Sequence, residues 1–494
     1  MTVEESVETR QGMSRAQNIV KDVAFYTSSV MLTQLVTVIV ALLTRRFLGP
    51  VQFGVWAFVQ TILMYSEHSH LGTLSAVSRE IPFYKGKNDA EKVDVIKNTV
   101  FSFSIVTSLV TSVAIAGYAL WSKAKMPKEL FVGFMVISAI IPLQRYNNLL
   151  VSLLRAYKRF FLAGRQAFLS AVLNAFLVAV LSYFYKLYGF MTGIGLSLLF
   201  NIVYIHCHEK MNFRFQMRRT ELVGLVRYGV PLMLIAFLGT VFETSGRLVI
   251  TKWMGFEALG HYSIALLVMS YIYSIPNSIS IVLVPNLHEK FGVRENKKDL
   301  KGYLEKANTV FSALAVFLTG LVWFGGPIMV QLFLPAYETG LPAMRLLVLG
   351  MYFMTLAQAY GQFIYAVRKH MSLFYLYGLS CVMMFGFNWF FGVRLGKGIE
   401  GVALASSLVM VLHWSFIYAY VSLQVKSLYE SITSYFVLVG KFGLMLLFLF
   451  VIGKYSTNAF LGLVLFQFLC IPFALAAVHK LGLMPALRQK LHVV

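Results

Sequence analysis

The sequence contains little charge and almost no cysteine. Only 13% of its 494 residues are charged and 58% are hydrophobic, a composition that excludes an ordinary soluble globular protein. The three cysteines, Cys207, Cys381 and Cys470, are too few and too scattered for a disulfide framework or a metal site. Walker-type phosphate loops, GxSxG elbows and HExxH motifs are all missing from the sequence. We therefore expect no catalytic residue, no metal and no cofactor.

Long apolar runs take the place of charge. A helical crossing of a bilayer needs about 20 apolar residues. About fourteen such runs occur, beginning near residues 23, 53, 99, 131, 161, 189, 226, 259, 309, 342, 371, 402, 435 and 460. The stretch before the first run mixes acidic and basic residues and has no small-residue cleavage site, so we do not interpret it as a signal peptide. The sequence predicts an all-α polytopic membrane protein with about fourteen transmembrane helices.

The net charge of +22 follows the predicted topology and does not indicate a nucleic-acid partner. If the N-terminus is cytoplasmic, lysine and arginine concentrate in the inside segments, for example 208–219 and 294–306, and are fewer in the outside loops. An even number of crossings returns the basic C-terminus to the same side. We therefore predict a multi-pass protein of the cytoplasmic membrane with both termini in the cytoplasm.

Three short echoes indicate an internal duplication. The pentapeptide Asn98-Thr99-Val100-Phe101-Ser102 recurs at 308–312. The glycine-containing segment 49–56 has a similar counterpart at 255–262, and segment 155–159 has one at 365–369. Six crossings per copy preserve orientation, so the copies should be two six-helix lobes related by a pseudo-two-fold axis. The predicted divisions are a cytoplasmic segment 1–22, a lobe 23–207, a linker 208–225, a lobe 226–424, and two extra helices with a tail, 425–494.

Two acidic residues, Glu67 and Glu243, fall well within predicted spans, where each would cost roughly 3 kcal/mol if unpaired. Glu243 precedes Arg247 by one turn, so the two form either a structural ion pair or a functional charge site. Glu67 lies among serines and histidines in 66–70, which is either a proton relay or cation site, or a helix end that breaks at Gly72. Both acids are candidates for ion coupling.

Basic and amide side chains are the candidates for binding an anionic substrate. A guanidinium group buried in a membrane lobe usually faces water or an anion, because it forks onto phosphate with two hydrogen bonds. Polar threonines on the first span, in contrast, are often only packing contacts between helices. The candidates are Arg45 and Arg46 at the end of the first span, Arg145 beside Asn148 on the fourth, and Gln358 and Gln362 one turn apart on the tenth.

Several short segments resemble a known family. They are Arg46-Phe47-Leu48-Gly49-Pro50 with Phe53-Gly54, then Tyr228-Gly229-Val230-Pro231, and Gly255 with Gly260 and Tyr262. Together they resemble the polysaccharide transporter family of Wzx-type oligosaccharide flippases. That family belongs to the multidrug/oligosaccharidyl-lipid/polysaccharide exporter (MOP) superfamily, with the lipid II flippases and the MATE drug exporters. The resemblance implies two six-helix bundles around a central cavity, with two further helices.

The resemblance also implies a function. The expected activity is movement of a polyprenyl-pyrophosphate-linked oligosaccharide across the membrane, with the lipid bilayer and a glycan polymerase or glycosyltransferases as further partners. Cationic cavities in such proteins point to Arg45, Arg46, Arg145 and Arg247. A lipid II-type or MATE-like exporter is the alternative, although the first-helix acid of many MATE exporters has no counterpart between Val23 and Thr44. A membrane glycan polymerase or ligase would need a large outer loop, and the outer loops here are short.

Overall fold

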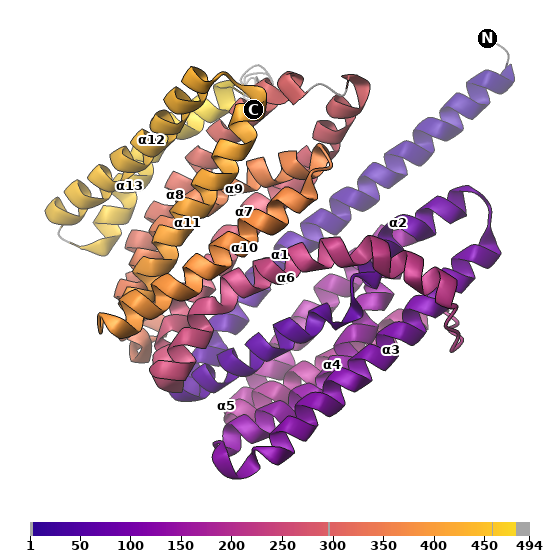
Figure 1. Ribbon diagram of the computed structural model, residues 1–494, viewed down its shortest axis with the longest axis horizontal. Coiled ribbons are helices and arrows are strands. Elements are labelled where there is room, and N and C mark those ends of the chain that lie inside the picture. The colour runs from indigo at the N-terminus through magenta and orange to yellow at the C-terminus, as the bar shows by residue number, and fades with distance from the viewer. Residues whose placement is uncertain (1–2, 295–296, 457, 481–494) are drawn as a thin grey trace, which may run out of the picture. The chain divides into compact units, whose positions relative to one another are not determined.

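The protein is all-helical over the residues that the computed structural model describes (Figure 1). These are residues 3–294, 297–456 and 458–480, with side chains described for 32–34, 36–276, 297–298, 300–456 and 458–471. The side chains of the predicted segment 1–22 and the tail from 481 lie outside this part. The chain divides into two compact units, Met1–Phe237 and Leu238–Val494.

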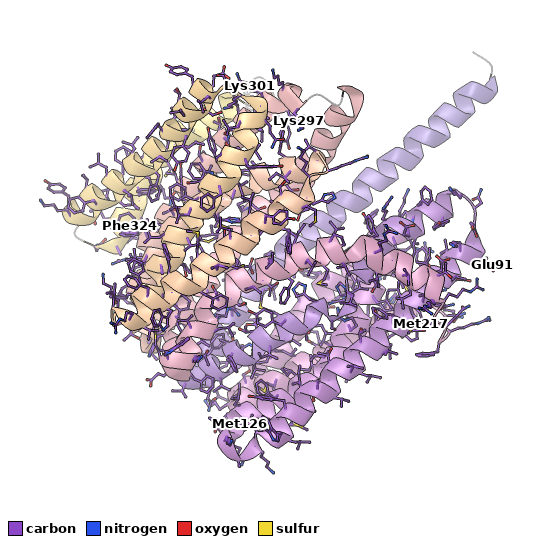
Figure 2. The ribbon with its side chains drawn as sticks, viewed as in Figure 1. Glu91, Met126, Met217, Lys297, Lys301 and Phe324 are labelled. Carbon is purple, nitrogen blue, oxygen red and sulfur yellow. The ribbon has the colours of Figure 1, made fainter. Side chains whose placement is uncertain are left out.

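The first unit is a bundle of long helices with one short helix inserted. Its elements are α1 (Val3–Ser66), η1 (Glu67–His70), α2 (Thr73–Gly86), α3 (Ala90–Trp121), η2 (Lys123–Lys125), α4 (Lys128–Ala156), α5 (Phe160–His208) and the first half of α6 (Arg219–Trp253). Helix α3 runs from near Glu91 to the turn that contains Met126 (Figure 2). Apolar side chains of α2, α3 and α4, including Val77, Val100 and Leu149, form a fully buried core.

Two of these helices are interrupted by non-helical backbone. Helix α1 breaks at Gly49 (φ 70°, ψ 173°) and α5 at Lys186 (φ 50°, ψ −129°). The two parts of α5 form an antiparallel pair, because Gln166 donates a hydrogen bond to Asn201 (3.2 Å) and Ser197 to Asn174 (3.0 Å). Each of these elements therefore supplies two helical segments.

The second unit is built mainly from α7 to α13. Its elements are the rest of α6, α7 (Gly255–Arg294), η3 (Lys297–Leu300), α8 (Lys301–Phe333), η4 (Pro335–Gly340), α9 (Leu341–Ala366), α10 (His370–Phe387), a π-helical turn η5 (Asn388–Arg394), α11 (Gly398–Val425), α12 (Leu428–Tyr455) and α13 (Ala459–Lys480). Helix α9 lies at the centre, in contact with α7, α8 and α11. In Figure 2, Lys301 labels the start of α8 and Phe324 labels a position further along the same helix.

The helices account for every predicted apolar run. Among the described residues, eleven helices are long and apolar enough to cross a membrane. Two of these are the interrupted α1 and α5, and α13 adds a further apolar helix. Helices suit this composition because a backbone in lipid must satisfy its own hydrogen bonds. The chain is a multi-pass membrane protein. Helix α6 begins at Arg219, earlier than the predicted end of the linker at residue 225.

The duplication is visible in the backbone. Gly49 and Gly255 both have positive φ (70° and 89°) at the junction of two helical segments. Lys158 and Arg368 also have matching φ values of 60° and 58°. Each of these two residues donates its N–H to a carbonyl three residues earlier, Arg155 or Tyr365, at 3.0 and 3.1 Å. Two of the three echoes found in the sequence therefore coincide with positions of matching positive φ, and the pentapeptide copies lie within α3 and α8.

The segment 209–218, which joins α5 to α6, has neither helix nor strand and is hydrogen-bonded to α3. Its backbone N–H groups donate to polar side chains of the first pentapeptide copy: Arg214 to Asn98 (3.1 Å), Gln216 to Ser102 (2.8 Å) and Arg218 to Thr99 (3.5 Å). The start of α6 is held to α3 by an ion pair between Lys92 and Glu221. The first pentapeptide is thus the docking site of this connecting segment.

Candidate functional site

The first candidate site is a break in the helical backbone of the first unit. Helix α1 ends at Ser66, residues 67–70 form a single 3₁₀ turn, and Leu71 and Gly72 adopt left-handed conformations before α2 begins. The break expected at Gly72 is therefore present. A helix end leaves carbonyl groups without intrahelical donors, and in a membrane protein these groups need partners from elsewhere.

Arg145 of α4 supplies most of those partners. Its side chain is 2% exposed, and its terminal nitrogens donate to the carbonyl oxygens of Ser66 (2.7 Å) and Glu67 (2.8 Å) and to the Ser69 hydroxyl (3.1 Å). Its positive charge also lies at the negative end of the α1 dipole. Arg145 thus caps α1 from a neighbouring helix. Its Nε has no hydrogen-bond partner within the described part of the chain.

The carboxylate of Glu67 completes this arrangement. Its Oε2 lies 3.7 Å from the Arg145 guanidinium and accepts a hydrogen bond from Asn148 (3.0 Å) one turn along α4. The structure therefore brings together three residues singled out in the sequence: Glu67, Arg145 and Asn148. The break also orients His70, whose Nδ1 accepts a hydrogen bond from the Gly72 N–H (2.8 Å).

Helix α6 packs directly onto this break. A Cβ atom added to Gly229 would lie 2.4 Å from the Gly72 carbonyl oxygen, and one added to Gly72 would lie 2.2 Å from the Gly229 backbone. Such distances leave no space for a side chain at either position. The glycine of the Tyr228-Gly229-Val230-Pro231 segment is thus explained by a contact between two backbones.

The second candidate site surrounds Glu243 and Arg247 in the second unit. Both lie on α6, one turn apart, and the Glu243 carboxylate interacts electrostatically with Arg247. The Glu243 carboxylate also interacts electrostatically with the hydroxyl groups of Tyr273 and Tyr377. Polar aromatic side chains therefore share the surroundings of this acid, which the sequence alone does not reveal.

The predicted amides lie on the buried central helix of this unit. Tyr273 also interacts with Gln358 of α9, which links that glutamine to the surroundings of Glu243. Gln362 lies one turn further along α9 and is half-buried. Four of the predicted residues, Glu243, Arg247, Gln358 and Gln362, therefore belong to α6 and α9 within one unit.

Arg45 and Arg46 point into different environments. The Arg45 side chain is buried, donates to the Ala41 carbonyl oxygen (2.9 Å) and lies 4.1 Å above the Phe53 ring. Arg46 is exposed. Adjacent residues of a helix face different directions, so the sequence pair does not act as one cationic group.

Lys441 is a charged residue inside a predicted span that was not singled out from the sequence. Lys441 lies in the middle of α12 and donates a hydrogen bond to Ser312 of α8 (3.2 Å). Its position within the apolar run that begins near residue 435 was the available signal, because an ionisable residue within a span is expensive unless it has a partner or a function.

A comparison with models of protein families shows which family the chain belongs to. The family model described as "Polysaccharide biosynthesis protein" matches residues 42–337, which is more than half of the chain. The chain belongs to this family. The matched region of this polysaccharide biosynthesis family member includes the helix break, Arg145, Glu243 and Arg247. No curated protein is significantly similar to it in sequence.

Solved structures confirm the fold of this family member. The inward closed conformation of the lipid II flippase MurJ is similar with a TM-score of 0.71 at 15% identity, covering 92% of this chain and 99% of that one. An inward-facing MATE multidrug transporter of the MOP superfamily is similar with a TM-score of 0.65 at 15% identity, covering 79% and 95%. A MOP superfamily transporter from Pyrococcus furiosus gives a TM-score of 0.59 at 15% identity, covering 82% and 97%. At these identities the likeness establishes the fold alone.

Proposed function

We propose that the protein is a flippase that translocates a polyprenyl-pyrophosphate-linked oligosaccharide across the cytoplasmic membrane by alternating access, with both termini in the cytoplasm. The observation that carries this proposal is the match to the polysaccharide biosynthesis family in a chain composed of apolar helices. The fold shared with MurJ and MATE transporters supports a flippase or exporter. A glycan polymerase or glycosyltransferases remain predicted partners.

The buried cations fit such a cargo. A pyrophosphate needs positive charge and hydrogen-bond donors to enter a low-dielectric region, and arginine supplies both. Arg145 and Arg247 lie inside helices that are apolar enough to span the membrane. The terminal nitrogens of Arg145 are bonded to the end of α1, so we propose that Arg145 shapes the broken helix. We propose Arg247, one turn from Glu243 on α6, as the residue that contacts the phosphate.

Net transport needs a driving force. We propose that Glu67 and Glu243 couple transport to an ion gradient, in which each charge moved is worth about 2.3 kcal/mol per 100 mV. Both acids lie in helices of the transmembrane bundle and beside an arginine. Consumption of the lipid after translocation is the alternative source of direction.

A small-molecule exporter is the second candidate, because the fold is shared with MATE transporters. Cationic drugs would be repelled by Arg145 and Arg247, whereas a lipid-linked pyrophosphate would be attracted. A glycan polymerase or ligase is the least favoured candidate, since the connections between the described helices are short.

The test is translocation in liposomes. Purified protein is reconstituted with a fluorescent lipid-linked oligosaccharide, and translocation is scored as protection from an external quencher. We expect Arg247→Gln to abolish most transport and Arg394→Gln, which removes an exposed arginine, to leave it unchanged. Full transport by a folded Arg247→Gln variant would reject the role of Arg247. Movement of cationic drugs without any movement of the lipid-linked sugar would reject the flippase function.

A further inference from the structure

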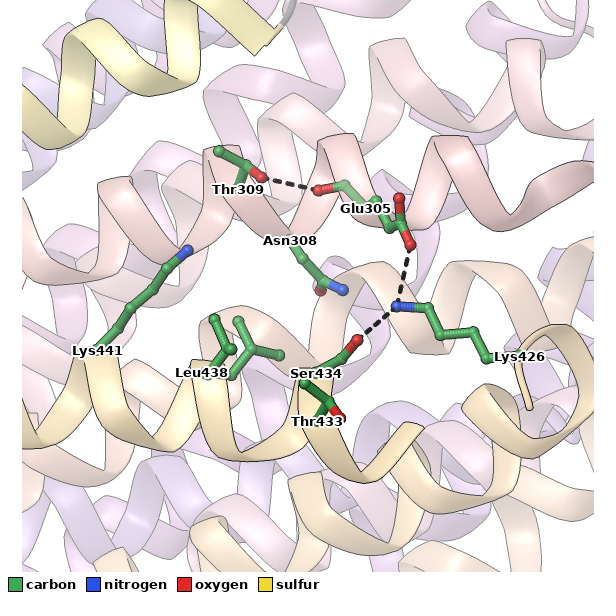
Figure 3. A pocket seen from close by; sticks show the side chains of 9 residues that line it. Glu305, Asn308, Thr309, Lys426, Thr433, Ser434, Leu438 and Lys441 are labelled. Atoms are coloured by element: carbon green, nitrogen blue, oxygen red, sulfur yellow. Dashed lines mark hydrogen bonds and ion pairs between the residues drawn. The ribbon is translucent and has the colours of Figure 1, made fainter. Parts of the chain in front are cut away.

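The second copy of the repeated pentapeptide lines a polar cavity in the second unit. The cavity has a volume of about 310 Å³ and lies where α8 meets the start of α12 (Figure 3). This is at the lower end of the volumes of small-molecule pockets. The polar lining consists of Glu305, Asn308 and Thr309 from α8, Lys426 from the α11–α12 connection, and Thr433, Ser434 and Lys441 from α12.

The lining has an excess of positive charge. Lys426 Nζ lies 3.3 Å from the Glu305 carboxylate and donates to the Ser434 hydroxyl (3.0 Å), with its side chain 6% exposed (Figure 3). Lys441 adds a second ammonium group and donates to the Ser312 hydroxyl (3.2 Å). Two amines and one carboxylate therefore line the same cavity. Such a site favours an anion, because ammonium groups bind phosphate oxygens through charge-assisted hydrogen bonds.

Asn308 shows that the cavity also offers an acceptor. Its side chain is 8% exposed and donates from Nδ2 to the Tyr360 hydroxyl (2.5 Å), while Oδ1 has no hydrogen-bond partner within the described residues. The matching oxygen in the first copy, Oδ1 of Asn98, accepts from the Arg214 N–H of the connecting segment. A buried polar atom normally has a partner. Oδ1 of Asn308 could accept a hydrogen bond from a ligand, as Oδ1 of Asn98 accepts one from a backbone N–H.

The surroundings of the cavity are apolar and lead to lipid. On α12, Ile432, Phe436 and Val437 are exposed, as is Tyr429 in the first turn. Aromatic residues of this kind are enriched where a helix crosses the membrane interface. The same end of the unit carries Lys297, Lys298, Lys301 and Lys306, a concentration of basic residues that attracts anionic lipids.

We propose that this cavity binds the headgroup of an anionic phospholipid whose head also carries hydroxyl groups, as in phosphatidylglycerol. The phosphate binds Lys441 and Lys426, a headgroup hydroxyl donates to Asn308 Oδ1, and the acyl chains lie along the exposed apolar face of α12. This lipid is a resident ligand and not the transported cargo, so the site can be tested without any transport assay.

The test measures lipid binding to the purified full-length protein by native mass spectrometry. The probes are phosphatidylglycerol, phosphatidic acid, phosphatidylcholine and soluble glycerol 1-phosphate. We expect phosphatidylglycerol to bind best. Lys441→Gln should weaken its binding roughly tenfold, because one charge-assisted contact is lost. Lys397→Gln removes an exposed lysine at the opposite end of α11, and binding should not change. Asn308→Val should weaken binding of phosphatidylglycerol and leave that of phosphatidic acid unchanged.

Three results would overturn the proposal. The first is equal binding of phosphatidylcholine, and the second is saturation by glycerol 1-phosphate at the same concentration, which would indicate a soluble phosphate ester as the ligand. The third is unchanged binding of phosphatidylglycerol in both Lys441→Gln and Asn308→Val. If these variants do not fold, the wild-type protein can be labelled with photoactivatable phosphatidylglycerol. Labels within 301–312 or 428–441 support the site, and labels confined to other segments reject it.

Discussion

Replacement of Arg145 should destabilise the protein through the end of α1 more than through the lost ion pair. Arg145→Ala removes the donors of two carbonyl oxygens, of Ser66 and Glu67, and of the Ser69 hydroxyl. Each buried acceptor left without a partner costs about 1–3 kcal/mol. Removing one member of a buried charged pair costs about 3–5 kcal/mol in total. This total already includes the cost of the unpaired acceptors, so the two values are not added.

Two milder variants separate these contributions. Arg145→Lys keeps the charge, but a single ammonium group cannot reproduce the fork that reaches both carbonyl oxygens, so we expect a loss of about 1–3 kcal/mol. Glu67→Gln removes only a carboxylate that is 3.7 Å from the guanidinium and 30% exposed, so we expect about 1 kcal/mol or less.

The assay is the apparent melting temperature of the detergent-solubilised protein, measured by size-exclusion chromatography after heating. The expected order of destabilisation is Arg145→Ala, then Arg145→Lys, then Glu67→Gln. Lys128→Ala, which removes an exposed lysine from the same helix, should change little. If Glu67→Gln destabilises as much as Arg145→Ala, the ion pair is dominant and the capping argument is wrong.

Three further predictions follow from the same structure. Gly229→Ala should lower the melting temperature, at a cost of about 1–3 kcal/mol for overpacking, whereas Gly224→Ala on an exposed part of α6 should raise it slightly. Glu243→Gln should abolish the pH or sodium dependence of transport in liposomes, and unchanged dependence in this variant and in Glu67→Gln would exclude coupling through these acids. Asn98→Leu should expose the 209–218 segment to limited proteolysis, and wild-type resistance would show that its hydrogen bonds do not hold that segment.

The fold was predictable because its determinants are local. Apolar runs of sufficient length fix the helices, and the repeated motifs around Gly49 and Gly255 fix the duplication. The helix break before Gly72 was also predictable, since serines, histidines and a glycine follow an apolar run there. These features depend on neighbouring residues in the chain and need no knowledge of tertiary contacts.

The contacts of the site depend on tertiary structure and were less predictable. The main partners of Arg145 are backbone carbonyl oxygens, which every sequence contains and which therefore give no signal. The i,i+4 spacing of Glu243 and Arg247 places both on one face of α6, but neighbours from other helices, such as Tyr377, interact with the carboxylate. The contact between Lys441 and Ser312 joins residues 129 positions apart, which periodicity does not reveal.

At each of the paired turns, the residue in the left-handed conformation, Lys158 or Arg368, is also a basic residue. A left-handed conformation costs a non-glycine residue about 1–2 kcal/mol, and glycine would relieve that strain. A lysine or arginine near an anionic leaflet gains about 1 kcal/mol from the surface potential, which glycine would lose. If both turns face the cytoplasmic leaflet, as the proposed topology places them, glycine should stabilise the protein in neutral detergent and weaken its attraction to an anionic membrane.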